Sequence, residues 1–272
     1  MNHKLALLAT IGTLLAATCH ADELAEKGRD IFKKNQHAVV TVQIVLKVTG
    51  GGRGGGPSES KKDITGTVID PSGLTVVALS AVDLFELARR VSEEYNKIDT
   101  QINDVKMLLE DGTEVPSEIV LRDKDMDLAF IRPKVKPATP MTAVDLSKSS
   151  PVEVMEPVVA MNRLNRAAGR AYAASFERIS AVIQKPRTFY IPDASQTSTT
   201  LGSPAFALNG NVVGIFVNRA ISAGEGAGRN LSEFVTLILL PAEDILKGAK
   251  QAPEAKGETE KPAEAKEPKD GK

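Results

Sequence analysis

Residues 198–215, STTLGSPAFALNGNVVGI, predict a tight turn that leads into a β-hairpin. Gly202 and Pro204 mark the turn, because both residue types favour the backbone angles that turns need. An apolar run follows, and Asn209-Gly210 is the pair that the shortest hairpin reversals prefer. Residues 212–217 then return as the second strand of the pair. The stretch therefore predicts antiparallel β-structure at this point of the chain.

The composition is that of a globular protein rather than a disordered or fibrous one. The 272 residues are 42% hydrophobic and 25% charged, which is enough for one large or two small cores. The formal net charge of −1 argues against nucleic acid or an anionic membrane as the main partner.

Residues 1–21 have the pattern of a secretory signal peptide. A lysine precedes an apolar run over residues 5–18, and small residues before Asp22 offer a cleavage site. The run is too short to span a bilayer comfortably, so we expect cleavage and no stable membrane span afterwards. Cys19 raises the alternative of a lipoprotein, but the residues before it fit that signal poorly. We therefore expect a periplasmic or secreted chain whose mature form has no cysteine and a single histidine, His37.

Hydrophobic periodicity predicts strands along most of the chain and a few helices. In the first half we expect a helix over 21–36, a strand over 39–48, a flexible loop over 50–62, a hairpin over 66–82, an amphipathic helix over 84–102, and a strand pair over 105–109 and 115–121. In the second half we expect a crossing segment over 133–140, strands over 154–161, 171–182 and 234–240, a solvated arginine-containing turn over 162–170, a helix over 242–250 and a disordered tail over 251–272. The folded region is therefore expected to cover residues 22–250.

Several segments resemble the protease domain of trypsin-like serine proteases of the HtrA/DegP kind. The hairpin of residues 198–215 is similar to that family's nucleophile segment, in which Gly-Asn-Ser-Gly-Gly-Pro precedes strands ending in Val-Val-Gly-Ile. Residues 66–82 resemble its Gly-Val-Ile-Asp-x-x-Gly-Tyr-Ile-Leu-Thr-Asn-Asn-His-Val-Val segment. Residues 123–131 match its Asp-x-x-x-Asp-Leu-Ala-x-Leu motif. The resemblance covers about residues 38–247.

This resemblance implies an all-β, trypsin-like double β-barrel made of two Greek-key barrels. The first barrel would cover about residues 38–132 and the second about residues 141–240, with short terminal helices. The helix over 84–102 is then an insertion beside the cleft. We expect its apolar stripe to pack on the first barrel, with a cap over the cleft or an oligomer contact as alternatives. The PDZ domain usual in this family is not expected.

The same register gives the positions that correspond to the family's catalytic triad. The histidine position holds Ser80, the aspartate position holds Asp127 and the serine position holds Leu201. The oxyanion loop corresponds to Thr199 and Gly202, and a β-branched residue at 199 disfavours the angles that aim amide hydrogens at an anion. Serine has no titration near neutral pH and cannot act as a general base. The resemblance therefore implies the fold of a protease without its catalytic activity.

Other catalytic chemistries have little support in the sequence. Ser203 lies two positions beyond the nucleophile position, and no histidine occurs in the matched cleft segments to serve it. A Ser/Lys dyad on Ser80 or Ser203 would need a lysine in those segments, and none is present there. Metal-dependent hydrolysis would need His, Cys or carboxylate clusters at ligand spacing, and none is visible. We therefore expect no metal and no cofactor.

Three functions remain open. The first is a pseudoprotease that binds protein or an extended peptide by strand addition along a wall formed by Gly214, Ile215, Phe216, Val217 and Asn218. The second is an active serine endopeptidase with non-standard catalytic residues. The third is a structural or regulatory subunit that assembles into a homo-oligomer, or with an active relative, through the 84–102 helix or the tail.

Overall fold

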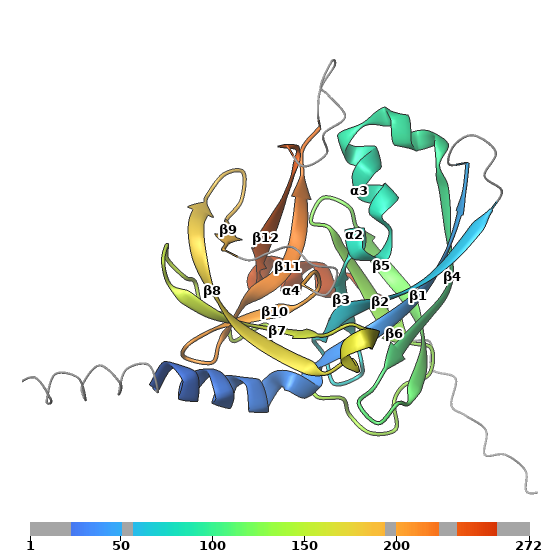
Figure 1. The fold of residues 1–272 in the computed structure, drawn as a ribbon. Coiled ribbons are helices and arrows are strands. Elements are labelled where there is room, and N and C mark those ends of the chain that lie inside the picture. Colours follow the sequence, from blue (N-terminus) through green and yellow to red (C-terminus); the bar gives the residue numbers. More distant parts are fainter. Residues whose placement is uncertain (1–22, 51–56, 194–199, 223–232, 255–272) are drawn as a thin grey trace, which may run out of the picture.

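Two closed β-barrels, each of six strands, make up the body of the protein (Figure 1). The computed structural model describes residues 23–50, 57–193, 200–222 and 233–254. Neighbouring strands pair in antiparallel fashion in both barrels. The expected all-β double barrel is therefore confirmed, whereas the signal peptide expected at residues 1–21 lies outside the described residues.

The first barrel closes in the strand order β1-β2-β3-β6-β5-β4. Alternate residues of β1, Val40, Val42 and Ile44, enter its hydrophobic core, as the period of two in the sequence predicts. The strands are β1 Val39–Thr49, β2 Ser58–Val68, β3 Thr75–Ala78, β4 Asp99–Leu108, β5 Glu114–Asp123 and β6 Leu128–Pro133.

The second barrel closes in the order β10-β11-β12-β9-β8-β7. The hairpin predicted from Asn209-Gly210 is the β10–β11 pair, and Gly210 has a φ of 84° that this reversal requires. The strands are β7 Pro157–Arg163, β8 Tyr172–Ile183, β9 Phe189–Pro192, β10 Pro204–Ala207, β11 Val212–Ala220 and β12 Val235–Pro241.

The helical segments are short. They are an N-terminal helix over residues 23–35, the helices α2 Leu79–Val82, α3 Leu84–Val91 and α4 Ala242–Ala249, and the 3-10 turns η1 Gln36–Ala38, η2 Glu93–Lys97 and η3 Arg166–Ala168. No helix within the described ranges is long and apolar enough to cross a membrane.

The N-terminal helix lies against the second barrel, although it leads into the first strand of the first barrel (Figure 1). Gly28 faces the ring of Phe176 in β8 so closely that a Cβ at Gly28 would lie 2.6 Å from a ring carbon. Ile31 and Phe32 join the same hydrophobic cluster as Val159 of β7. The helix therefore ties the start of the described chain to β7 and β8.

One hydrophobic cluster runs through both barrels. It contains Val76 and Phe130 from the first barrel and Phe206 and Phe216 from the second, all at most 1% exposed. Each such side chain contributes about 1.5–3 kcal/mol when it leaves water. The barrels therefore share a core at their junction, where the candidate site lies.

The helix predicted over residues 84–102 is wrong in its second half. α3 ends at Val91, and β4 begins at Asp99 after the turn η2. In β4, Ile102 pairs with Leu46 of β1. The segment contains Asp, Asn and β-branched residues, which are weak helix formers, so pairing with β1 outweighs the helical spacing of its apolar residues.

Several other boundaries differ from the sequence expectation, among them the start of β7 at Pro157 instead of residue 154, and β9 was not expected. β2 begins at Ser58, inside the predicted flexible loop, because its residues pair with the far end of β1. The return strand of the 66–82 hairpin ends at Ala78, where α2 starts. The first residues of the predicted tail are placed on the first barrel, where the Pro253 carbonyl accepts a hydrogen bond from Arg132 Nε at 2.6 Å. Residues 255–272 lie outside the described part of the chain.

The turn over residues 162–170 is less solvated than expected. Arg163 is 7% exposed, and its guanidinium carbon lies 4.1 Å from the centre of the Tyr172 ring. Arg170 reaches β2 and pairs with Asp63 at 2.7 Å. A cation over an aromatic face and an ion pair to the first barrel therefore hold two of its arginines against the protein.

Candidate functional site between the barrels

The positions expected for the base and the acid of a triad are in direct contact. Ser80 lies in α2, directly after β3, and Asp127 lies in the turn before β6. Ser80 Oγ donates a hydrogen bond to Asp127 Oδ2 at 2.7 Å, and the Ser80 N–H donates to Oδ1 at 2.8 Å. The Leu79 N–H donates to the Asp127 carbonyl at 2.8 Å. Three hydrogen bonds therefore hold these two segments together.

Asn218 of β11 reaches the same carboxylate from the second barrel. Its N–H donates to Asp127 Oδ2 at 2.8 Å, and its Nδ2 donates to Ser80 Oγ at 3.1 Å. Asp127 has a φ of 57°, a left-handed conformation that is uncommon in residues other than glycine. The Ser80–Asp127–Asn218 cluster therefore joins α2, the turn before β6 and β11.

Burial raises the pKa of Asp127 from 3.8 to about 6, because the ionised carboxylate is poorly solvated there. Hydrogen bonds from Asn218 and Ser80, and the positive charge of Arg90, act in the opposite direction. A carboxyl group with such a pKa can accept a proton near neutral pH. However, Asp127 and Ser80 are only 2% and 4% exposed, so a substrate carbonyl has no access to the Ser80 oxygen.

Leu201, at the position expected for the nucleophilic serine, is a core residue. Its side chain is 6% exposed and belongs to the hydrophobic cluster that the two barrels share. Ser203, the other candidate nucleophile of this turn, is 1% exposed. Thr199 lies outside the described residues. Neither Leu201 nor Ser203 therefore presents a reactive oxygen to solvent.

Gly202 holds this turn against the first barrel. Its carbonyl accepts a hydrogen bond from Thr67 Oγ1 at 2.8 Å, and its N–H donates to the Phe216 carbonyl at 2.8 Å. Its φ is 86°, and a Cβ here would lie 2.2 Å from the carbonyl oxygen of Thr65. The Gly202 amide is therefore bonded to the protein itself and is not available to stabilise an oxyanion.

The predicted peptide-binding wall lies inside the second barrel. β10 pairs with β11 as far as Ile215, and the next N–H, that of Phe216, donates to the Ser203 carbonyl at 3.0 Å. β12 pairs with the whole of this stretch on its other side. From Gly214 to Phe216, addition of a peptide strand would therefore first require β10 to separate from β11. All five wall residues are buried: Gly214, Ile215, Phe216, Val217 and Asn218.

α3 packs against β11 beyond the end of its pairing with β10. Leu87 and Val91 form a small hydrophobic cluster with Ala220, and Phe234 and Val235 pack against it. The apolar stripe of the helix therefore faces the second barrel rather than the first. The expectation that this stripe packs on the first barrel is therefore wrong for Leu87 and Val91.

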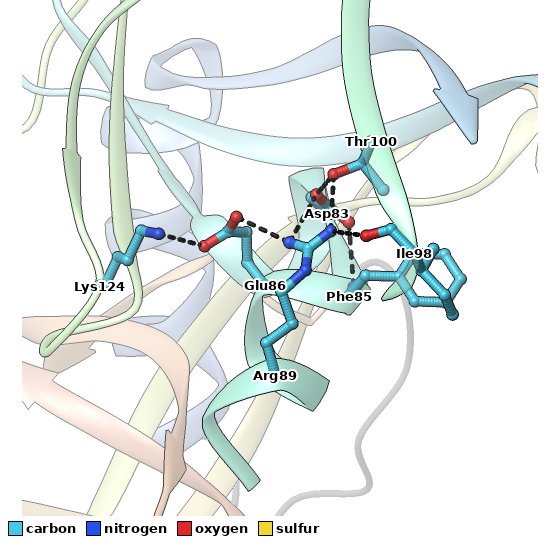
Figure 2. A network of polar contacts seen from close by, with 7 residues as sticks. All are labelled: Asp83, Phe85, Glu86, Arg89, Ile98, Thr100 and Lys124. Carbon is cyan, nitrogen blue, oxygen red and sulfur yellow. Dashed lines mark hydrogen bonds and ion pairs between the residues drawn. The ribbon is translucent and has the colours of Figure 1, made fainter. Parts of the chain in front are cut away.

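Polar contacts join the same helix to the first barrel (Figure 2). Asp83 caps the helix by accepting a hydrogen bond from the Phe85 N–H at 3.0 Å, and it also accepts one from Thr100 Oγ1 of β4. Arg89 donates to the Ile98 carbonyl at 2.7 Å. α3 therefore bridges the two barrels, with its polar side on one and its apolar side on the other.

Lysine and metal chemistry find little support in the described part of the chain. Burial lowers the pKa of Lys62, while the charge of Asp83 opposes that change. Within the described residues, Lys62 makes no hydrogen bond with Ser80. In the same ranges no group of three or more His, Cys, Asp or Glu side chains could hold a metal ion.

Replacing Leu201 by serine should weaken the fold without creating an enzyme. The change leaves a cavity in the shared core and buries a hydroxyl, so we expect the free energy of unfolding to fall by about 3 kcal/mol. Urea denaturation measures this loss, and peptide hydrolysis should stay at the level of the unchanged protein. Leu201→Met, which keeps the volume, is the matched control and should cost less than about 1.5 kcal/mol. Hydrolysis by Leu201→Ser would contradict the assignment of a buried, incomplete site.

Comparison with known proteins supports the fold and the family. The profile of the trypsin-like peptidase domain matches residues 64–215. No curated protein matches the chain. The solved structures similar to it include Deg5, at 18% identity and a TM-score of 0.52, covering 82% of this chain and 92% of that one. Another is the MamO protease domain from Magnetospirillum magneticum in its apo form, at 18% identity and a TM-score of 0.48, covering 79% of this chain and 97% of that one.

The sequence match and the architecture agree. The matched region begins in β2 and ends in β11, and it contains all three positions assigned from the triad register, Ser80, Asp127 and Leu201. Deg5 shares the fold over most of both chains. With two closed six-stranded barrels and a profile match over more than half of its length, this chain belongs to the trypsin-like peptidase domain family.

Proposed function

We propose that this protein is a catalytically inactive trypsin-like domain of the HtrA kind that acts by binding another protein. The observation that carries the proposal is the buried Ser80–Asp127–Asn218 cluster. In a working triad the carboxylate orients a histidine, which takes the proton of the nucleophile. Here a serine and a backbone amide occupy that carboxylate, and Leu201 has no oxygen to activate.

His37 does not supply the missing base. Its Nδ1 lies 2.9 Å from Glu110, and its ring stands edge-on to Tyr172 with the ring centres 5.5 Å apart. Neither of these residues belongs to the Ser80–Asp127–Asn218 cluster. Loss of either the serine or the histidine of such a triad costs about 10⁶ in turnover, so activity near background is expected.

A binding role is supported by the fold, because both barrels are complete although the catalytic residues are not. α3 is fixed between the barrels and covers the end of β11 at Ala220. A partner would therefore meet the surface around α3 and β11 instead of adding a strand to the barrel. The signal-like residues 1–21 support a periplasmic or secreted location for this contact. The partner is either an independent protein or an active relative of this chain.

Labelling with a fluorophosphonate tests the absence of catalysis. The purified mature protein should carry no adduct by intact mass spectrometry after prolonged incubation, because no activated serine is exposed to the reagent. An active trypsin-like protease in the same reaction serves as the positive control. Stoichiometric labelling that maps to one serine would overturn the proposal in favour of an endopeptidase with non-standard residues.

A further inference from the structure

A small pocket lies beside the covered end of β11. Its volume is about 220 Å³, and its lining includes Arg90 of α3, Arg187 of the turn between β8 and β9, and Arg219 of β11. Phe189 and Asn218 also line it. Three elements that are distant in sequence therefore bring three guanidinium groups to one pocket.

Within the described residues, the positive charge of this pocket is only partly balanced, because the Asp127 carboxylate interacts electrostatically with Arg90 alone. Asp125 is the only acidic residue of the lining. Within the described ranges, the guanidinium groups of Arg90, Arg187 and Arg219 form no ion pair and no hydrogen bond. The guanidinium carbon of Arg219 lies 4.6 Å from the centre of the Phe189 ring, an arrangement that orients a cation without neutralising it. The pocket is therefore a concentration of positive charge with unused donors.

We propose that this pocket binds an oxyanion, and that the source is the carboxylate of an acidic segment in the protein partner. Guanidinium groups present paired donors that match the two oxygens of a carboxylate. Arg90 and Arg219 are half-buried, which strengthens their contacts because the local dielectric is lower than that of water. The volume is below the range of about 300–1,000 Å³ that drug-sized ligands occupy, so it suits one side chain rather than a nucleotide.

α3 gains a role from this assignment. The helix covers the edge of β11 where a strand would add, and it supplies Arg90 to the pocket at the same place. Binding of a partner therefore depends on a side chain that the inserted helix supplies. This inference rests on the proposed function, because it names the kind of partner that the inactive domain recognises.

Fluorescence anisotropy with two labelled peptides tests the pocket. One peptide is an alanine–glycine sequence with two glutamates, and the other carries two glutamines in their place. We expect the glutamate peptide to bind at least tenfold more tightly, and 0.5 M NaCl to weaken its binding. Arg187→Gln and Arg219→Gln should each weaken that binding about tenfold, since each removes a charged donor. Arg122→Gln, an exposed arginine on β5, makes the same change of charge elsewhere and should leave the affinity unchanged.

The outcomes separate the possible sources and the two proposals. Displacement of the glutamate peptide by millimolar inorganic phosphate, with the same arginine dependence, supports an oxyanion site. Phosphate binding without any binding of the glutamate peptide would overturn the carboxylate as the source. Equal affinities of the two peptides, or full affinity in both arginine variants, would overturn the proposal that this pocket binds a carboxylate. The proposal of an inactive protein would still stand if the fluorophosphonate leaves no label. Labelling of a serine by the fluorophosphonate would overturn the proposed function and leave the arginine dependence intact. Arg187 is exposed, so its variant should fold normally.

Discussion

Replacing Gly202 by alanine should lower the free energy of unfolding by about 4 kcal/mol, a large part of the total for a domain of ordinary stability. Two costs add. The φ of 86° is strained for any residue with a Cβ, by about 1–2 kcal/mol. The new Cβ would also lie 2.2 Å from the Thr65 carbonyl oxygen, a backbone atom that can move only with β2, and such overpacking costs about 1–3 kcal/mol. Urea denaturation followed by circular dichroism measures the change.

Gly210→Ala is the matched control for this result. Gly210 has nearly the same φ, 84°, but no atom lies within 4 Å of the position that a Cβ would take. It should therefore show only the backbone strain, about 1 kcal/mol. Equal losses in the two variants would show that the turn is not pressed against the first barrel, and the account of Gly202 as a contact between the barrels would fail.

Replacing Asp127 by asparagine should remove a pH dependence of stability. The folded-state pKa of Asp127 is about 6 and the ordinary value is 3.8, so between these values the folded protein holds a proton that the unfolded chain has released. Stability from this group is present below pH 4 and is lost as the pH rises through 6, by about 3 kcal/mol in total. Asparagine does not titrate and tolerates the φ of 57°. Any loss of stability that the substitution causes is therefore the same at every pH and cancels from the comparison.

The measurement is the difference in unfolding free energy between the variant and the unchanged protein at several pH values. That difference should move in favour of Asp127→Asn from pH 4 to pH 7 and level off above that. Ser80→Ala keeps the carboxyl group and removes a donor that lowers its pKa, so this variant should keep the pH dependence and extend it to somewhat higher pH. A difference that does not change with pH would mean that Asp127 is ionised throughout, as in an ordinary surface carboxylate.

Much of the fold follows from local signals that the sequence carries openly. Asn209-Gly210 specifies its reversal through backbone angles, and the alternation in β1 specifies which side chains enter the barrel. Both signals depend on a few neighbouring residues, so the sequence alone predicts them. The positions of Ser80 and Asp127 came instead from the resemblance of two separate motifs to a known family, and the structure brings the two residues into contact.

The remaining features of the site depend on neighbours in space, which the pattern of a single strand or helix does not specify. The pattern of β11 predicts a strand, but β10 and β12 on its two sides decide that Phe216 is buried instead of lining an open wall. The apolar stripe of α3 predicts a buried face, but not that Leu87 and Val91 meet Ala220 of the second barrel. The family resemblance placed Asn218 in that wall, whereas no local signal in the sequence marks its contact with Asp127.

The packing of the N-terminal helix on β8 also sets an order of events during synthesis. Gly28 and Phe32 emerge from the ribosome more than a hundred residues before Phe176, the residue against which this helix is fitted. At about 5–20 residues per second, the apolar side of the helix lacks its partner for on the order of ten seconds. Until Phe176 has been synthesised, a nascent chain therefore holds an amphipathic segment whose apolar side has no partner.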